Sequence, residues 1–217
     1  MLMNCVSASV HIGALGLPGN LDLPPHPIGM VVFVPSEPGS RFNPRQQYLA
    51  RQLHALGLGT LMFDDGLGRD AVKRNPVLDI ARVSACTADS LTWLAAQPGM
   101  GQVPVGLYGA STGVAAALLL AAREPKRVQA LVAHGGRPDL AGTHLRRVYA
   151  PTLLLVDGDD PGLLELNRHA LHGLPGVHRL QTLCASKNAQ HEVDALNTSA
   201  TLTGNWFQQH LPQTLVH

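Results

Sequence analysis

The sequence predicts an α/β fold in which a mostly parallel β-sheet is flanked by helices. Short apolar runs alternate with helical patterns over most of the 217 residues, as crossover connections between parallel strands require. The length and the 45% content of hydrophobic residues suit a single domain covering residues 1–217. The segment from Val6 to Leu23 differs from the predicted parallel part, because it alternates apolar and polar residues and contains Gly13 and Pro18-Gly19-Asn20. It therefore predicts an antiparallel hairpin at one edge of the sheet.

The elements of the parallel part follow in chain order. The Asn43-Pro44 pair is a good N-cap and first helical residue, and it precedes leucines at helical spacing. Residues 76–97 place apolar side chains at the same spacing and predict a long amphipathic crossover helix. The buried strands are expected at Met30–Val34, Thr60–Phe63, Val103–Tyr108, Val128–Ala133, Thr152–Val156 and Arg179–Leu183. The remaining helices are expected at 114–122, 163–172 and 195–211, and the short stretch 135–151 leaves no room for a cap domain.

Composition excludes several classes of protein. Charged residues make up 14% of the chain and the formal net charge is +1, which does not suit nucleic acid or an anionic membrane surface as a partner. The three cysteines, Cys5, Cys86 and Cys184, are widely spaced, so we expect no disulfide framework and no structural zinc site, and we expect Cys184 to be a buried thiol. The first residues lack a basic region before an apolar core, and no apolar run reaches membrane-spanning length. A cytoplasmic protein without a signal peptide is therefore expected.

The run Gly109-Ala-Ser-Thr-Gly113 lies between a predicted strand and a predicted helix. A G-x-S-x-G sequence at such a junction is typical of a nucleophile elbow, a sharp turn that exposes a serine hydroxyl above the end of a sheet. Side chains two positions before and after the serine would collide with the neighbouring strand and helix, which explains the glycines. The pattern predicts Ser111 as a nucleophile at the start of a helix, where unpaired N–H groups favour an oxyanion.

A serine nucleophile needs a base, and the chain contains eleven histidines. Catalytic groups of a parallel sheet come from the carboxyl ends of its strands, the edge where Ser111 is expected. His191 follows the last strand and precedes the final helix, so it is the preferred base. His134 ends a strand on the same edge and is the alternative.

The acid that orients the base should follow a strand between the serine and the histidine. The run Asp157-Gly-Asp-Asp160 is in that position, and it offers three aspartates. Asp160 is preferred because the chain has turned through Gly158 before it, and Asp159 is the second choice. Asp157 is expected to end the strand or to brace the turn. The order serine, aspartate, histidine is that of one common serine hydrolase fold.

Taken together, these segments resemble the dienelactone hydrolase family of α/β-hydrolases over nearly the whole chain. The resemblance is carried by Val31–Val34, Ser40–Arg45, Gly57–Leu61, Gly109–Gly113, Gly135–Ala141 and Pro151–Leu155, which occur in the expected order and spacing. It implies an α/β-hydrolase fold with Ser111 as nucleophile, Asp160 as acid and His191 as base. The best-known members use a cysteine nucleophile, so the serine places this chain with the esterase-type branch.

One loop departs from that branch. Relatives commonly have a His-Gly-Ser-Gly run after the first parallel strand, whereas this chain reads Pro35-Ser-Glu-Pro-Gly39, and Pro38 has no N–H to donate. We expect the oxyanion hole to use the N–H of Thr112 with that of Ser36 or Glu37. Loss of one such donor typically slows an enzyme by about 100- to 1,000-fold. The Glu37 carboxylate would repel the oxyanion, gate it through a pair with Arg41 or Arg137, or simply point to solvent.

Arg137 follows a strand on the catalytic edge, where it would grip a substrate carboxylate or pair structurally with Asp139. No cofactor is implied, and no spacing of ligands predicts a metal site. The predicted function is a lidless serine hydrolase that cleaves small carboxylic esters or lactones through an acyl-enzyme. The alternative is a catalytically silent α/β-hydrolase that binds a ligand or a partner.

Overall fold

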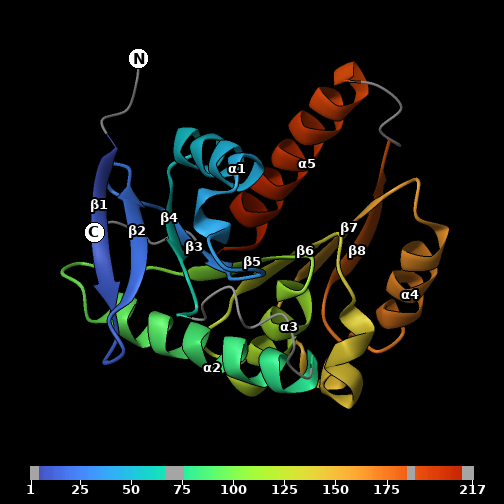
Figure 1. Ribbon diagram of the computed structural model, residues 1–217, viewed down its shortest axis with the longest axis horizontal. Coiled ribbons are helices and arrows are strands. Elements are labelled where there is room, and N and C mark those ends of the chain that lie inside the picture. Colours follow the sequence, from blue (N-terminus) through green and yellow to red (C-terminus); the bar gives the residue numbers. More distant parts are fainter. Residues whose placement is uncertain (1–4, 67–75, 185–188, 212–217) are drawn as a thin grey trace.

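The computed structural model describes residues 5–66, 76–184 and 189–211, so the part of the signal-peptide prediction that rests on residues 1–4 lies outside the described residues. Eight strands of the described chain form one sheet, in the order β1-β2-β4-β3-β5-β6-β7-β8 (Figure 1). They are β1 (Val6–Ile12), β2 (Leu17–Leu23), β3 (Gly29–Val34), β4 (Leu58–Phe63), β5 (Val105–Ala110), β6 (Ala130–His134), β7 (Thr152–Asp157) and β8 (His178–Leu183).

The sheet is parallel from β4 to β8, and its first two strands form an antiparallel hairpin. The hairpin strand β2 also pairs antiparallel with β4, with Gly19 opposite Phe63. Gly19 is required at that register, because a Cβ there would lie 2.8 Å from Ile12 Cδ1 and 3.0 Å from the Met62 carbonyl oxygen. The predicted edge hairpin and the predicted parallel sheet are both confirmed.

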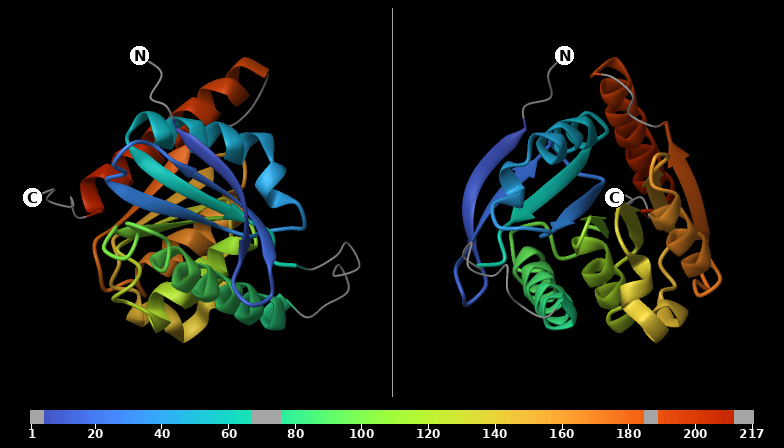
Figure 2. Two further views of the ribbon diagram at one scale, coloured as in Figure 1. Left: turned by 90° about the vertical axis from the view of Figure 1, so that its left-hand side faces the viewer. Right: turned by 45° about the vertical axis from the view of Figure 1, so that its right-hand side comes forward.

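Helices cover both faces of the sheet (Figures 1 and 2). They are η1 (Ser40–Phe42), α1 (Pro44–Ala55), α2 (Pro76–Ala95), α3 (Gly113–Arg123), η3 (Pro138–Arg147), α4 (Pro161–Leu171) and α5 (Ala189–His210). Successive strand residues face opposite layers, as the two-residue period of a strand requires. In β3, Val31 and Phe33 pack in the core under α1 and α5, whereas Met30 and Val32 pack in the core under α2 and α3.

The sheet has one apolar core on each face, and this explains why its strands are continuous apolar runs in the sequence. All six residues of β3 and all six of β4 are buried, as expected of parallel strands that are covered on both faces. α3 is buried from Gly113 to Ala122, because it packs against α2 and η3 as well as the sheet. The segment from Pro138 to Arg147 forms η3, in which two short helical stretches meet at a kink at Gly142, and it packs against α3 and α4. The described residues contain no separate cap domain.

The final helix begins earlier than the sequence predicted. α5 starts at Ala189 and not near residue 195, so His191 lies within its first turn and not in a preceding loop. Glu192 is an acidic residue in that turn, where it interacts favourably with the helix dipole, and Gln190 donates a hydrogen bond to the Asp194 side chain at 3.1 Å. Within the described residues, no helix is both long and apolar enough to cross a membrane.

Candidate active site

Ser111 lies on a sharp turn between β5 and α3. Its φ of 50° is in the left-handed region that residues other than glycine rarely adopt. The turn is held by a hydrogen bond from the Ser111 N–H to the His134 carbonyl oxygen at 3.0 Å, and the Ser111 residue is exposed. A strained, exposed serine between a strand and a helix has the geometry of a nucleophile elbow.

The glycines that flank the serine lie against backbone atoms. A Cβ on Gly109 would be 2.9 Å from the Gly113 carbonyl oxygen, and a Cβ on Gly113 would be 3.0 Å from the Val34 carbonyl oxygen. Both distances are shorter than an ordinary contact, and backbone atoms of the helix and strand cannot turn aside as a flexible side chain can. The steric reason that the sequence predicted for these two glycines is therefore confirmed.

A third glycine completes the turn, and sequence reasoning did not identify it. A Cβ on Gly136 would be 2.2 Å from the Ser111 carbonyl oxygen, so only glycine fits there. The Gly136 carbonyl in turn accepts a hydrogen bond at 3.1 Å from the buried Asn167 side chain of α4. The signal in the sequence was the Gly135-Gly136 pair directly after a strand on the catalytic edge.

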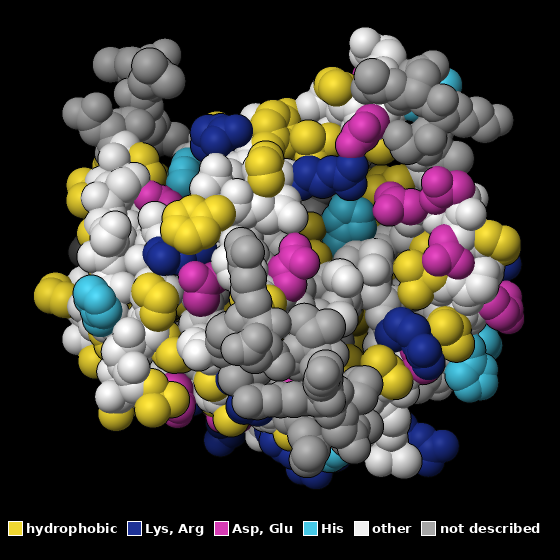
Figure 3. All heavy atoms as spheres, in the orientation of Figure 1, with side chains coloured by type: hydrophobic (Ala, Val, Ile, Leu, Met, Phe, Trp, Pro, Cys, Tyr) yellow, Lys and Arg dark blue, Asp and Glu magenta, His cyan; other side chains and the backbone are white. Residues whose placement is uncertain are grey.

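A pocket of about 390 Å³ opens beside the elbow, where the carboxyl ends of β5 to β8 meet α1 and α5. Charged and histidine side chains gather around a hollow on this face (Figure 3). The pocket is lined by Asn43, Arg45, Gln46, Leu49, Tyr108, Ala110, Ser111, His134, Gly135, Asp157, Asp159, Leu183, Cys184, Glu192, Ala195, Leu196 and Ser199. Cys184 is exposed there, so the expectation of a buried thiol is wrong.

The loop after β3 contacts the elbow on the side where an oxyanion hole is predicted. The Thr112 hydroxyl donates a hydrogen bond to the Ser36 carbonyl oxygen, which holds that loop against the start of α3. Within the described residues, the amides of Thr112, Ser36 and Glu37 donate to no protein acceptor. A backbone amide without an acceptor can bind an anion, but none of these three residues lines the pocket beside Ser111.

Glu37 does not form either of the arginine pairs considered from the sequence. Its side chain is exposed, and its carbonyl oxygen accepts a hydrogen bond from the Ser40 N–H at 3.0 Å. Arg41 pairs with Asp64 at 2.7 Å, and Arg137 pairs with Asp139 through two hydrogen bonds at 3.1 and 2.6 Å.

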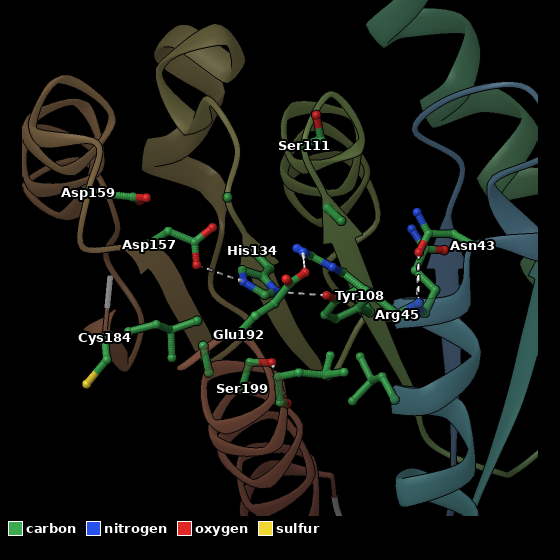
Figure 4. A pocket seen from close by; sticks show the side chains of 17 residues that line it. Asn43, Arg45, Tyr108, Ser111, His134, Asp157, Asp159, Cys184, Glu192 and Ser199 are labelled. Carbon is green, nitrogen blue, oxygen red and sulfur yellow. Dashed lines mark hydrogen bonds and ion pairs between the residues drawn. The ribbon is translucent and has the colours of Figure 1, made fainter. Parts of the chain in front are cut away.

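The sequence left two roles open for Arg137, binding a substrate carboxylate or pairing with Asp139. The structure shows the pair with Asp139. The pair lowers the pKa of the Asp139 carboxyl through the hydrogen bonds from the guanidinium, and it raises the pKa of Arg137. The arginine that lines the pocket is Arg45, which comes from the first turn of α1. It forms an ion pair with Glu192 of α5, and that pair joins the two helices beside the pocket (Figure 4).

His134 is the histidine that lines the pocket, and its ring lies between two partners (Figure 4). The Tyr108 hydroxyl is 3.0 Å from Nδ1, and the nearer carboxylate oxygen of Asp157 is 3.9 Å from Nε2. Burial, with the nearby Asp157 charge, raises the pKa of Tyr108 well above its usual value, so this hydroxyl keeps its proton. The adjacent His134 lowers the pKa of the Asp157 carboxyl by more than burial raises it. Asp157 also ends β7, as the sequence predicted.

The preferred acid and base are close to this pocket in the fold but do not line it. Asp160 is the N-cap of α4, and its carboxylate accepts a hydrogen bond from the Leu163 N–H at 2.8 Å. Asp159, the second choice, lines the pocket. His191 is an exposed residue of the first turn of α5, adjacent in sequence to Glu192, which does line the pocket. The described residues contain no group of three or more side chains that could hold a metal ion.

Comparisons with known proteins agree with the overall fold. The dienelactone hydrolase of Anabaena variabilis is 36% identical in sequence, and its crystal structure matches with a TM-score of 0.86 over 96% of this chain and 99% of that chain. A serine hydrolase without a lid from Xanthomonas campestris is 20% identical, with a TM-score of 0.72 over 99% and 98% of the two chains. At that identity the second likeness shows the fold alone.

Two proteins of Mycobacterium tuberculosis that are described as phosphoribosyl transferases are 40% identical over 199 residues. The match covers 92% of this chain but 45% of each relative, so the chain spans somewhat less than half the length of these proteins. No protein-family model matches the sequence. The match to the Anabaena enzyme covers almost all of both chains, and it confirms the predicted family: this chain belongs to the dienelactone hydrolase family of α/β-hydrolases.

Proposed function

We propose that this chain is a serine hydrolase that cleaves small carboxylic esters or lactones through an acyl-enzyme. The observation that carries the proposal is Ser111 itself. It is exposed, it is held at a φ of 50°, and it lies at the rim of a pocket of about 390 Å³. A serine in so strained a backbone conformation persists only where surrounding contacts impose it, and such strain is concentrated at functional sites.

In the proposed reaction the Ser111 hydroxyl attacks the substrate carbonyl while His191 accepts its proton. The amides of Thr112 and of the Ser36–Glu37 loop bind the oxyanion, and His191 then protonates the leaving alcohol. Water attacks the acyl-enzyme in the second half of the reaction, with His191 again as base. A positioned base of this kind contributes about 100- to 10,000-fold to the rate. For this step the His191 ring has to reach Ser111 from the first turn of α5.

We assign the orienting acid to Asp160. Its hydrogen bond from the Leu163 N–H uses Oδ1 and fixes the carboxylate at the start of α4, and the other oxygen can accept a hydrogen bond from His191. Asp160→Asn should lower kcat far more than Asp159→Asn, because the amide would hold the imidazole in the wrong tautomer. The reverse result would assign the role to Asp159.

The first test is hydrolysis of short-chain p-nitrophenyl esters by the purified protein and its Ser111→Ala variant. We expect turnover by the wild type and its loss in Ser111→Ala, and Ser9→Ala, which removes an exposed hydroxyl on the distant strand β1, should behave as wild type. A fluorophosphonate probe should add its mass to the peptide that contains Ser111. If wild type and Ser111→Ala are equally inactive and equally folded, the hydrolase proposal fails.

A catalytically silent binding module is the second candidate, and two observations favour it. Neither Asp160 nor His191 lines the pocket beside Ser111, and Pro38 removes a backbone donor from the oxyanion loop. Such a protein would bind an ester in the pocket without cleaving it. Binding of an uncleaved ester to the wild type, measured by calorimetry over hours without release of alcohol, would establish this alternative.

The name of the Mycobacterium relatives raises a separate question. We propose that phosphoribosyl transfer does not belong to the portion they share with this chain. The proposal is supported by coverage, because this chain matches 99% of the Anabaena dienelactone hydrolase, whereas more than half of each Mycobacterium relative lies outside the match. This chain alone should therefore release no pyrophosphate from phosphoribosyl diphosphate in the presence of a nucleobase. Release of pyrophosphate would contradict this division of functions.

A further inference from the structure

His134 and Asp157 form a pair inside the candidate active site that the proposed reaction does not use. Their carboxylate-to-Nε2 distance is 3.9 Å, which is longer than a direct hydrogen bond, so Nε2 keeps the capacity to form a hydrogen bond with a bound molecule. The His134 side chain keeps 22% of its surface exposed, and it lines the same pocket as Ser111. The backbones are adjacent as well, because the Ser111 N–H donates to the His134 carbonyl oxygen.

Two neighbours fix which ring nitrogen carries the proton in the neutral ring. Within the described residues, the buried Tyr108 hydroxyl has one hydrogen-bond partner, His134 Nδ1 at 3.0 Å, and the hydroxyl proton is satisfied only if it is donated to that nitrogen. The Asp157 carboxylate faces Nε2, and a carboxylate facing a ring nitrogen favours a proton there. Both contacts therefore place the proton on Nε2. In this tautomer His134 presents an N–H to the pocket and no lone pair, so it is a donor and not the base for Ser111.

The charges around the ring indicate what this donor would bind. Arg45 is already paired with Glu192, whereas Asp157 and Asp159 add negative charge on the other wall (Figure 4). A carboxylate on the substrate would be repelled by these two aspartates. A neutral oxygen would accept the hydrogen bond without that penalty.

We propose that the Nε2–H of His134 binds an uncharged ether, hydroxyl or carbonyl oxygen of the substrate acyl group and so makes this pocket selective for oxygen-bearing acyl groups over alkyl groups of the same size. The inference rests on the proposed function of Ser111, because the acyl group extends from that serine into the pocket. Tyr108 is a positioning residue, since it acts by holding the tautomer of His134.

The kinetic test compares p-nitrophenyl methoxyacetate with p-nitrophenyl butyrate, which have acyl groups of equal length and differ by an oxygen in place of a methylene. The quantity measured is the ratio of kcat/KM for the two esters, and intrinsic reactivity cancels when this ratio is compared between variants. His134→Leu should lower the ratio by about 3- to 10-fold, the effect of one neutral hydrogen bond. His134→Gln keeps an N–H donor, so its kcat/KM ratio should lie between the ratios of the wild type and of His134→Leu. His178→Leu changes an exposed histidine of β8, outside the pocket, and should leave the ratio unchanged.

Tyr108→Phe tests the positioning role. The phenyl ring keeps the packing against Phe33, whose ring centroid is 5.0 Å away, while the hydroxyl is lost. Long-range ¹⁵N–¹H spectra of histidine-labelled protein should show the His134 proton on Nε2 in the wild type and a mixture of tautomers in Tyr108→Phe. A wild type with the proton on Nδ1 would overturn the proposal.

A binding measurement separates this inference from the proposed hydrolase activity. In the Ser111→Ala background, methyl methoxyacetate should shift the His134 Nε2 signal and methyl butyrate should not. If the wild type hydrolyses neither p-nitrophenyl ester, the proposed function fails, and this shift alone decides the inference. If both esters are hydrolysed and His134→Leu leaves their ratio unchanged, the inference is overturned while the hydrolase proposal stands.

Discussion

Ser111 combines an exposed hydroxyl with a backbone conformation that a glycine would adopt more easily. For residues with a Cβ the left-handed region costs about 1–2 kcal/mol, and here the cost is offset by contacts made by the elbow as a unit. The hydrogen bond to the His134 carbonyl and the close packing of Gly136 are among those contacts. The strain is therefore a property of the site that can be measured separately from catalysis.

Ser111→Gly should be more stable than Ser111→Ala by about 1 kcal/mol, because both lack the hydroxyl and only alanine keeps the strained Cβ. The comparison is made by urea unfolding, with the slope of free energy against urea checked to be the same in both variants. Equal stabilities would mean that the backbone relaxes when the serine is replaced, and that the elbow does not impose the conformation.

Gly113→Ala should destabilise the fold by about 1–3 kcal/mol, because its Cβ would press on the Val34 carbonyl oxygen at 3.0 Å and neither backbone can move aside. Gly101→Ala is the matched control, since its Cβ would meet its nearest neighbour at an ordinary 3.4 Å. The control should stay within about 0.5 kcal/mol of wild type. Similar values for both variants would remove the steric explanation of the motif.

Helix α5 was predicted from the sequence, but it begins at Ala189 and not near residue 195. Its first turn is polar, with Gln190, His191 and Glu192, so the apolar periodicity that marks a helix starts only near residue 195. Contacts with α1 stabilise this end of α5: Arg45 pairs with Glu192 in the extra residues, and the Tyr48 hydroxyl donates to the Asn197 side chain just after them. These contacts join residues about 150 positions apart in the chain, and sequence periodicity does not report them.

The other end of α5 is fixed by burial. Phe207 is fully buried against β5, where a Cβ on Gly106 would lie 2.5 Å from its ring. Phe207→Ala should lower the free energy of unfolding by about 3–5 kcal/mol, while the exposed neighbour Gln209→Ala should change it by less than about 0.5 kcal/mol. Chemical denaturation monitored by circular dichroism measures both. A loss below about 1 kcal/mol for Phe207→Ala would mean that α5 contributes little to this core.

At the scale of the whole molecule, charge pairing makes stability depend on acid pH. The pKa of Asp139 is lowered chiefly by the hydrogen bonds from Arg137, and the pKa of Asp157 is lowered chiefly by the adjacent His134. The unfolded state therefore binds more protons than the folded state below about pH 4, so stability falls as the pH is lowered through that range. At higher pH the contribution of both carboxylates is fully present.

The Asp139→Asn, Asp157→Asn double variant should lose stability less steeply than wild type below about pH 4, because two of the linked protons are removed. Thermal unfolding midpoints recorded from neutral to acid pH give the comparison. Asp89→Asn, an exposed carboxylate of α2, serves as the control for a general change in charge. Identical acid slopes in wild type and the double variant would show that these pairs do not drive the acid dependence.

The sequence by itself determined the parallel sheet, the edge hairpin and the elbow. These follow from local signals, namely apolar runs of strand length, caps and turns, and two glycines at fixed distances from one serine. The tertiary structure decided which side chains enter the pocket. His134, Tyr108 and Asp157 meet because strands β5, β6 and β7 are neighbours in register, and Arg45 meets Glu192 because α1 and α5 cover the same face. Such meetings depend on strand order and on where helices begin, since a shift of one residue turns a strand side chain to the other face.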